Sequence, residues 1–405
     1  MRHIWFPLIL LLCIACNSKD RNEIRIDKEQ QFHQKLLTID SHTDTPLNIM
    51  RQGQDLSVRS SPKKNGSKLD FPRMKEGGLD GAFFAVFVGQ GPRTPEGNEK
   101  AMKTALAIFD TLHAVINRNQ DIVSLGLNSS DLAKINRQGK LAIFIGIENG
   151  YVIGNDIKMI EKYYNLGTRY ITLCHSENND ISDSSTGHEG AENNGLSEFG
   201  KEVVTEMNRL GIMIDVSHAS DKAFYDVLKL TKTPVIASHS GARAICNHPR
   251  NLNDSMLVAL ARNGGVVQVC MVGEYLKEIP DSPERDSARQ AVIDTYGNYY
   301  NLTPEKQDEF LKAWFAVDSI FPPVMATVSD FVDHIDHIVR VAGIEHVGIG
   351  TDFDGGGELK DCFDVSEMGN ITHELLRRGY SRSDIGKIWS GNLLRVFREV
   401  EEMRE

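Results

Sequence analysis

The chain has 405 residues, of which 25% are charged and 40% hydrophobic, and its formal net charge is −11. This composition is typical of a soluble globular protein. The basic residues are scattered rather than clustered, which argues against a nucleic-acid partner.

The first residues predict an export signal. A basic start leads into a short apolar run, Ile4–Ala15, which is followed by Cys16 and polar residues. The order of basic, apolar and small residues is that of a signal segment over residues 1–16. The junction at Cys16 resembles a bacterial lipoprotein signal, in which this cysteine carries the lipid. We therefore expect residues 17–405 to form one domain that is lipid-anchored at the bacterial cell envelope. The alternative is a plain secretory peptide and a secreted or periplasmic protein.

Eight apolar runs are typical of buried parallel strands, because strands covered on both faces read as unbroken stretches of Val, Ile, Leu and Ala. The runs are Leu36–Asp44, Gly78–Val88, Leu141–Glu148, Tyr170–His175, Ile212–His218, Pro234–His239, Gly264–Met271 and Val347–Asp352.

Helical segments separate these runs. They are Asn98–Asn117, Asp156–Leu166, Ser197–Leu210, Asp221–Leu230, Asp254–Arg262 and Ser381–Glu402. Several begin with Ser, Asp or Asn, which are favoured N-caps. Strands that alternate with helices indicate a parallel sheet. Eight repeats favour closure into a (β/α)8 barrel, a fold that spans about 200 to over 400 residues as one domain.

One connection between strands differs from the others in its length. Val272–His346, between the seventh and eighth strands, is far longer than a usual connection between a strand and a helix. It contains several aromatic residues and predicts a helical insertion over or beside the barrel rim. Within it, His334 and His337 fall at helical spacing, and we expect both to face solvent.

Six of the eight runs end in side chains suited to metal binding or proton transfer. These residues are His42 and Asp44 together, Glu148, His175, His218, His239 and Asp352. The carboxyl ends of barrel strands converge on one rim, where the active site lies. Buried ionisable groups are costly unless they are paired or bind a metal. The pattern therefore predicts a metal-dependent hydrolase.

The spacing suggests how the groups divide. His42 and Asp44 lie two residues apart, so they share a face of the strand and are suited to one ion. Glu148 has two oxygens and is suited to bridging two cations about 3.5–4 Å apart. His218 and His239 end adjacent strands and can offer two imidazoles to a second ion, a set that suits zinc. The alternatives are a polar strand end, an ion-paired glutamate and hydrogen-bonded histidines.

Asp352 lies in the segment GTDFDG. A calcium-binding loop is excluded because Gly356 and Phe363 stand where oxygen ligands are required. We therefore interpret Asp352 as a proton-transfer carboxylate beside metal-bound water.

The segments HTD, GIENG, TLCHS, DVSH, SHSGAR, HPRN and GIGTDFDG, taken in this order, resemble the membrane (renal-type) dipeptidase family of zinc peptidases. The resemblance runs from about Thr38 to Phe397. Each motif is weak alone, but the ordered set is highly specific.

The resemblance implies a barrel that binds two Zn²⁺ ions and forms a homodimer. It assigns His42 and Asp44 to one ion, His218 and His239 to the other, Glu148 to the bridge, His175 to the scissile carbonyl, Arg250 to the substrate carboxylate and Asp352 to proton transfer. In this scheme a hydroxide that bridges the zinc ions attacks the peptide bond of a dipeptide.

Two alternatives differ in function. A related amidohydrolase would act on another small carboxylate-bearing amide, lactam or ester, since fold does not fix the substrate. A surface lipoprotein that uses an inactive barrel as a binding module would have lost some ligands, whereas all five predicted ligands are present.

Overall fold

The computed structural model describes residues 28–62, 67–188, 190–297, 299 and 302–405. The predicted signal segment, including Cys16, lies outside the described residues. In the described part of the chain, no helix is both long enough and apolar enough to cross a membrane.

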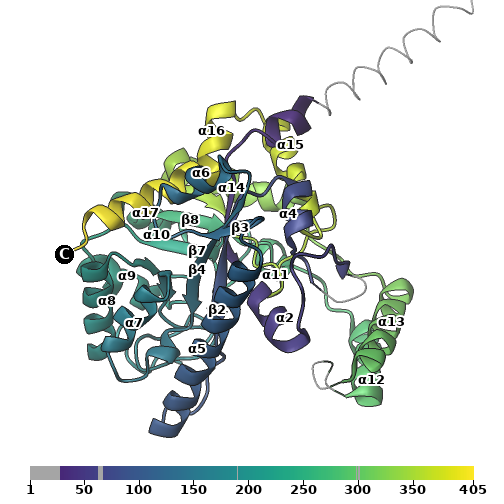
Figure 1. Cartoon of the computed structure of the whole chain (residues 1–405), viewed down its shortest axis with the longest axis horizontal. Coiled ribbons are helices and arrows are strands. Elements are labelled where there is room, and N and C mark those ends of the chain that lie inside the picture. The colour runs from purple at the N-terminus through teal and green to yellow at the C-terminus, as the bar shows by residue number, and fades with distance from the viewer. Residues whose placement is uncertain (1–27, 63–66, 189, 298, 300–301) are drawn as a thin grey trace, which may run out of the picture.

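Eight parallel strands form a nearly closed barrel, which confirms the predicted (β/α)8 fold (Figure 1). In order around the barrel they are β1 (Ile39–Thr43), β2 (Gly81–Phe87), β4 (Leu141–Glu148), β5 (Thr168–Thr172), β6 (Met213–Asp215), β7 (Ile236–Ser240), β8 (Val266–Val269) and β9 (Val347–Ile349). A short strand that the sequence did not predict, β3 (Val123–Leu125), pairs with β4.

The two ends of the sheet meet just beyond β1 and β9. The backbone N–H of Asp352 donates to the carbonyl of His42 at 3.0 Å, and the N–H of Asp44 donates to the carbonyl of Phe353 at 2.8 Å. This junction between the ends of β1 and β9, the seam of the barrel, therefore places His42, Asp44 and Asp352 side by side.

The α-helices include α2 (Thr45–Gln52), α4 (Phe71–Gly77), α5 (Pro95–Arg118), α6 (Asp131–Asn136), α7 (Lys158–Asn165), α8 (Glu198–Leu210), α9 (Asp221–Leu230), α10 (Asp254–Asn263), α11 (Gly273–Leu276), α12 (Pro283–Tyr296), α13 (Pro304–Ile320), α14 (Val328–Ala342), α15 (Gly369–Arg377), α16 (Arg382–Gly386) and α17 (Asn392–Glu402). A π-helical turn joins α16 to α17.

Side chains cap three of these helices, although only Ser197 begins a predicted segment, and Ser220 and Asn253 lie one residue before the predicted starts at Asp221 and Asp254. Ser197, Ser220 and Asn253 precede α8, α9 and α10, and each side chain accepts a hydrogen bond from the backbone N–H three residues later. Gly211 and Gly264 end α8 and α10 with φ values of 70° and 82°, a conformation that glycine adopts at little cost. These short, defined helix ends set where β6 and β8 begin.

Two apolar cores hold the barrel together. One lies between the strands and the surrounding helices. The other fills the barrel interior, where Phe83, Phe144 and Tyr170 pack against Leu393 and Phe397 of α17. Because α17 packs into this inner core, the barrel is filled below the rim and the polar strand ends lie at the opposite, open end.

The long connection between β8 and β9 forms α11 to α14, which confirms the predicted helical insertion. Figure 1 shows α12 and α13 to one side of the barrel. The expectation that His334 and His337 of α14 face solvent is wrong, because the two residues are only 0% and 8% exposed. The His334 ring accepts a hydrogen bond from the N–H of Ala242 and donates to the carbonyl of Leu276, so its burial leaves no ring nitrogen unpaired.

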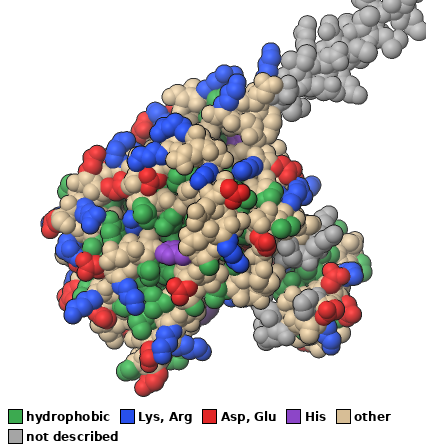
Figure 2. Space-filling view, viewed as in Figure 1, with side chains coloured by type: hydrophobic (Ala, Val, Ile, Leu, Met, Phe, Trp, Pro, Cys, Tyr) green, Lys and Arg blue, Asp and Glu red, His purple; other side chains and the backbone are tan. Residues whose placement is uncertain are grey.

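Positive and negative side chains are interspersed over the face shown in Figure 2. The four cysteines of the described residues, Cys174, Cys246, Cys270 and Cys362, are buried free thiols.

Candidate metal centre

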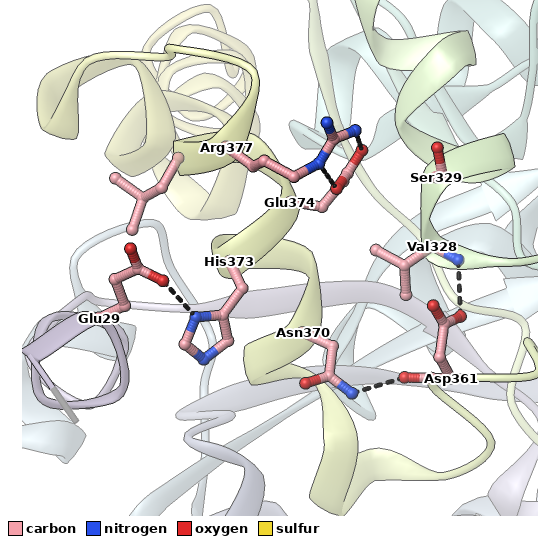
Figure 3. Close-up of a pocket in the computed structure, with 9 residues that line it drawn as sticks. Glu29, Val328, Ser329, Asp361, Asn370, His373, Glu374 and Arg377 are labelled. Atoms are coloured by element: carbon pink, nitrogen blue, oxygen red, sulfur yellow. Dashed lines mark hydrogen bonds and ion pairs between the residues drawn. The ribbon is translucent and has the colours of Figure 1, made fainter. Parts of the chain in front are cut away.

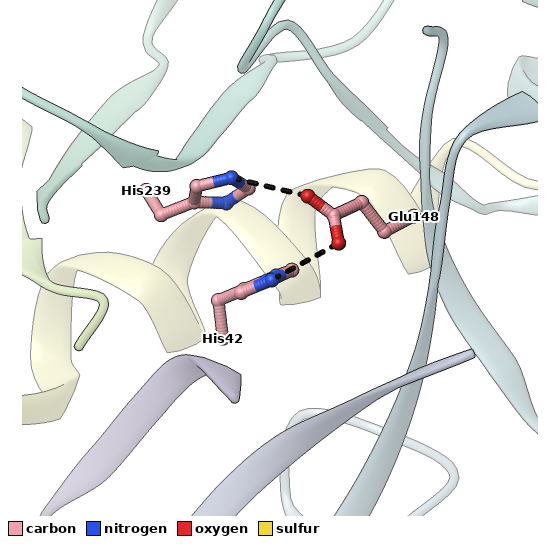
Figure 4. A group of neighbouring side chains, drawn as sticks. All are labelled: His42, Glu148 and His239. Atoms are coloured by element: carbon pink, nitrogen blue, oxygen red, sulfur yellow. Dashed lines mark ion pairs between the residues drawn. The ribbon is translucent and has the colours of Figure 1, made fainter. Parts of the chain in front are cut away.

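Glu148, the last residue of β4, lies at the centre of a buried group of histidines. Its Oε2 is 3.6 Å from Nε2 of His42, whereas its Oε1 is 3.1 Å from Nε2 of His218 and 3.4 Å from Nε2 of His239. Figure 4 shows the carboxylate between His42 and His239. Each oxygen of Glu148 therefore faces a different imidazole group.

These separations suit metal ligation. Two ligand atoms bound tetrahedrally to zinc at about 2.0–2.1 Å lie about 3.3–3.4 Å apart. The distances from Glu148 to the three histidines span 3.1–3.6 Å. The ligand atoms of His42, Glu148 and His239 all lie within 4.8 Å of one another.

Two further groups adjoin the first. His42, Asp44 and Asp352 form one, in which His42 Nε2 lies 3.8 Å from Oδ1 of Asp352. Glu148, His175 and His218 form the other. The structure thus brings together all seven side chains that the sequence predicted at the strand ends.

Unpaired polar atoms indicate that the centre fits metal ions. Nε2 of His42, Oδ1 of Asp44 and Oε2 of Glu148 are buried and lack a hydrogen-bond partner among the described residues. Buried polar atoms of this kind are rare in native proteins and are suited to a partner such as an ion. The donors, imidazoles and carboxylates, are those that zinc binds.

The charges of the cluster favour cations. Burial lowers the pKa of His42, but the carboxylates of Glu148, Asp44 and Asp352 outweigh burial and raise it to about 10. Burial and the negative Glu148 raise the pKa of Asp44 well above its usual value. Burial also raises the pKa of Asp352 to about 7, with Glu148 adding to the rise and His42 opposing it. Three carboxylates crowded out of water are stabilised by bound positive charge.

The pKa values of His218 and His239 are shifted in the opposite direction from that of His42. Burial holds the pKa of each imidazole well below its usual value, and neighbouring cationic groups lower it further. Both rings are therefore neutral, which is the form that coordinates a metal.

Arg250 lies next to this centre and is only 3% exposed. Its Nη2 donates to the backbone carbonyl of His239 at 3.0 Å. Its Nε and Nη1 are buried and have no acceptor among the described residues. A buried guanidinium with two free donors is suited to a carboxylate ligand.

The backbone around the centre is strained. His218 and Asp352 have φ values of 67° and 58°, and Asn149, which follows Glu148, has a φ of 76°. Non-glycine residues with such φ values cluster at functional sites. A Cβ atom on Gly355 would lie 2.2 Å from Asp352 Oδ1 and 2.3 Å from Asp44 Oδ2, so only glycine fits against these carboxylates.

Comparison with known proteins gives the family. The model of the membrane dipeptidase family, peptidase family M19, matches residues 26–405. The chain belongs to this family. The predicted family is therefore confirmed.

Individual relatives agree with this assignment. Dipeptidase tcpJ of Claviceps purpurea (strain 20.1) is 31% identical over 372 residues, which cover 90% of this chain and 77% of the relative. The crystal structure of the probable dipeptidase PvdM from Pseudomonas aeruginosa is 29% identical with a TM-score of 0.79 and covers 93% of this chain and 98% of that chain. A metallopeptidase from Rhodobacter sphaeroides, solved with a phosphinate mimic of the dipeptide L-Ala-D-Ala, is 23% identical and has a TM-score of 0.70. The match covers 90% of this chain and 99% of that chain. At that identity the likeness shows the fold alone.

This member of the membrane dipeptidase family also has supporting residues that the motifs did not reveal. The hydroxyl of Tyr170 lies 2.8 Å from Nδ1 of His42. The ring of Tyr275 packs 5.3 Å from the Arg250 guanidinium. The thiol of Cys270 lies 3.8 Å from Oδ2 of Asp352. Tyr170 and Cys270 lie in apolar strand runs, so only their three-dimensional neighbours distinguish them from ordinary core residues.

A surface hollow elsewhere on this family member shares no residue with the centre (Figure 3). It is lined by Glu29, Val328, Ser329, Asp361, Asn370, His373, Glu374, Leu376 and Arg377. Its polar groups are largely paired with one another, as in the contact of 2.9 Å between His373 and Glu29.

Proposed function

We propose that this chain is an exported dipeptidase that uses two zinc ions to hydrolyse the peptide bond of dipeptides. The observation that carries the proposal is the placement of Glu148, whose two oxygens face His42 on one side and His218 and His239 on the other. A carboxylate so placed is suited to joining two ions.

The two proposed sites share this carboxylate. His42 and Asp44 would hold one ion, and His218 and His239 the other. Zinc bound there supplies a water of lowered pKa and polarises the carbonyl of the substrate.

The remaining residues act on the substrate directly. Arg250 would bind the C-terminal carboxylate with its free Nε and Nη1 donors, which restricts cleavage to the bond next to the last residue. His175, whose Nε2 lies 3.6 Å from Oε1 of Glu148, would donate a hydrogen bond to the carbonyl oxygen as negative charge develops there. Asp352, with a pKa near neutrality, would take a proton from water and return it to the leaving amine.

Export and anchoring form a separate part of the proposal. Residues 1–16 would direct export, and lipidated Cys16 would attach the protein to the cell envelope. Replacing Cys16 by Ser should release the protein from the membrane fraction while the activity of the purified chain stays unchanged. A variant that still partitions with membranes would contradict the anchor.

The activity is tested by metal analysis together with a substrate pair. We expect about two zinc ions per chain and a kcat/KM far higher for a dipeptide than for the same dipeptide amidated at its C-terminus. Replacing Arg250 by Met should remove this preference. Equal kcat/KM values for the wild-type chain would instead favour a broader amidohydrolase.

A further inference from the structure

A buried chain of polar groups lies beneath His239. The Ser238 hydroxyl is 2.6 Å from Oδ2 of Asp215 and 2.8 Å from Nδ1 of His239. Asp215, Ser238 and His239 are 0%, 0% and 1% exposed. Asp215 is the last residue of β6, so it reaches across to β7 below the metal centre.

The chemistry of these groups fixes the position of each hydrogen. An ionised carboxylate only accepts hydrogen bonds, so the Ser238 hydroxyl donates its one hydrogen to Asp215. The Ser238 oxygen then accepts from Nδ1 of His239, which must carry the ring hydrogen of the neutral imidazole. Nε2 of His239 is left with its lone pair, and this atom lies 2.9 Å from Nε2 of His218 and 3.4 Å from Oε1 of Glu148.

We infer that Asp215 and Ser238 are positioning residues that hold His239 in the Nδ1–H tautomer, with Nε2 ready to coordinate a metal. The inference rests on the proposed zinc sites and adds two residues that act on the ion through His239. Groups that orient a ligand imidazole in this way contribute strongly to metal affinity.

The other two predicted imidazole ligands lack this arrangement. Nδ1 of His218 is buried without a partner among the described residues. Nδ1 of His42 faces the hydroxyl of Tyr170, which can either donate or accept, so that contact does not fix a tautomer. Of the three, His239 therefore has the Nδ1 that is held by a hydroxyl whose direction a carboxylate sets.

The surroundings of Asp215 make one substitution especially informative. Its Oδ1 accepts from the backbone N–H groups of Ser217 and Ser238 at 3.0 and 2.8 Å, and these groups can only donate. Its Oδ2 faces two hydroxyls, those of Thr172 and Ser238. In Asp215→Asn the amide oxygen must occupy the Oδ1 position, so the amide nitrogen takes the Oδ2 position and donates to both hydroxyls.

Asp215→Asn thus keeps the same polar groups in place but reverses the direction of the hydrogen bonds between residue 215, Ser238 and His239. The Ser238 hydroxyl, now an acceptor from Asn, turns its hydrogen towards Nδ1 of His239. The imidazole then carries its hydrogen on Nε2, and the atom needed for the metal is blocked.

The test uses the full chain with ¹⁵N-labelled histidine. Two-bond ¹⁵N–¹H correlation spectra of the metal-free protein distinguish the two tautomers. We expect Nδ1–H for His239 in the wild-type chain and Nε2–H in Asp215→Asn. Zinc affinity, measured by competition with a chromophoric chelator, should fall about 10–100-fold at one of the two positions. Ser238→Ala, which removes the hydroxyl between Asp215 and His239, should lower the zinc affinity as well.

Ser240→Ala is the matched control, because the buried Ser240 hydroxyl lies 3.4 Å from that of Ser217 rather than on an imidazole. It should keep both the tautomer and the zinc affinity. An Nε2–H tautomer in the wild-type chain would overturn the inference without any variant, and so would unchanged zinc binding in Asp215→Asn. Absence of zinc uptake by the wild-type chain would instead overturn the proposed function, while the spectra would still decide the tautomer.

Discussion

The Asp40 carboxylate in β1 accepts two hydrogen bonds from Thr351, which lies just beyond β9. Its Oδ2 is 2.6 Å from the Thr351 hydroxyl, and its Oδ1 is 2.8 Å from the Thr351 backbone N–H. Oδ1 also accepts from the N–H of His42 at 3.2 Å. One buried carboxylate therefore joins the first and last strands of the barrel between two predicted functional residues, His42 and Asp352.

Replacing Thr351 by Val should destabilise the chain, because it keeps the side-chain shape but removes the hydrogen bond to the buried Asp40 carboxylate and the one from the backbone N–H of Phe353. Hydrogen bonds to charged groups contribute about 1.5–3 kcal/mol. The free energy of unfolding from urea denaturation measures the effect. Thr168→Val is the matched control, since the Thr168 hydroxyl is buried without a partner among the described residues. It should be neutral or stabilising, and equal losses in both variants would contradict the role of Thr351 at the seam.

The strand ends were predictable because a buried parallel strand and the ionisable side chain at its end both leave a local signal. An unbroken apolar run followed by His, Asp or Glu marks the barrel rim, and all seven such side chains do gather there. The ordered motifs in addition identified the family.

Other features depend on contacts that no local pattern encodes. Asp215 and Ser238 lie in apolar runs and become informative only because β6 and β7 pair. Helical spacing showed that His334 and His337 share a face but not that this face packs inwards. The three residues of β3 are too few for a periodic signal.

Replacing Asp352 by Asn should lower turnover sharply and leave zinc content intact. Asp352 is the proposed proton carrier, and Asn has the same size but cannot accept a proton. Loss of general acid–base catalysis typically costs about 10²–10⁴-fold in rate. Steady-state kinetics and metal analysis of the same preparation check both expectations. Normal turnover would exclude Asp352 from proton transfer, and loss of zinc would indicate that it is a ligand instead.

Replacing Glu148 by Gln should weaken metal retention at both positions. The amide keeps one oxygen, so only one of the two imidazole groups would still face an anionic or carbonyl donor. We expect metal analysis after dialysis against a mild chelator to show fewer than two ions per chain. Glu76→Gln is a suitable control, because Glu76 pairs with Arg59 at 3.0 Å on the surface. Unchanged stoichiometry in Glu148→Gln would argue against a bridging role.

The stability of the chain should depend on pH through Asp80, which precedes β2. Burial raises the pKa of this carboxyl to about 6, although hydrogen bonds from Thr38 and Asn136 oppose the rise. Because the folded state holds the proton more tightly than the unfolded chain, the stability that protonated Asp80 provides is fully present below about pH 4. It is lost as the pH rises through about 6, and the shift from 3.8 corresponds to at most roughly 3 kcal/mol. Asp80→Asn and Asp80→Ala both remove the titrating group, so the stability of each variant relative to wild type should rise between pH 4 and pH 7. Unfolding temperatures of wild type and variants, measured in parallel at fixed zinc content, test this trend. If the difference between variant and wild type stays constant from pH 4 to pH 7, Asp80 is not the group that makes stability depend on pH.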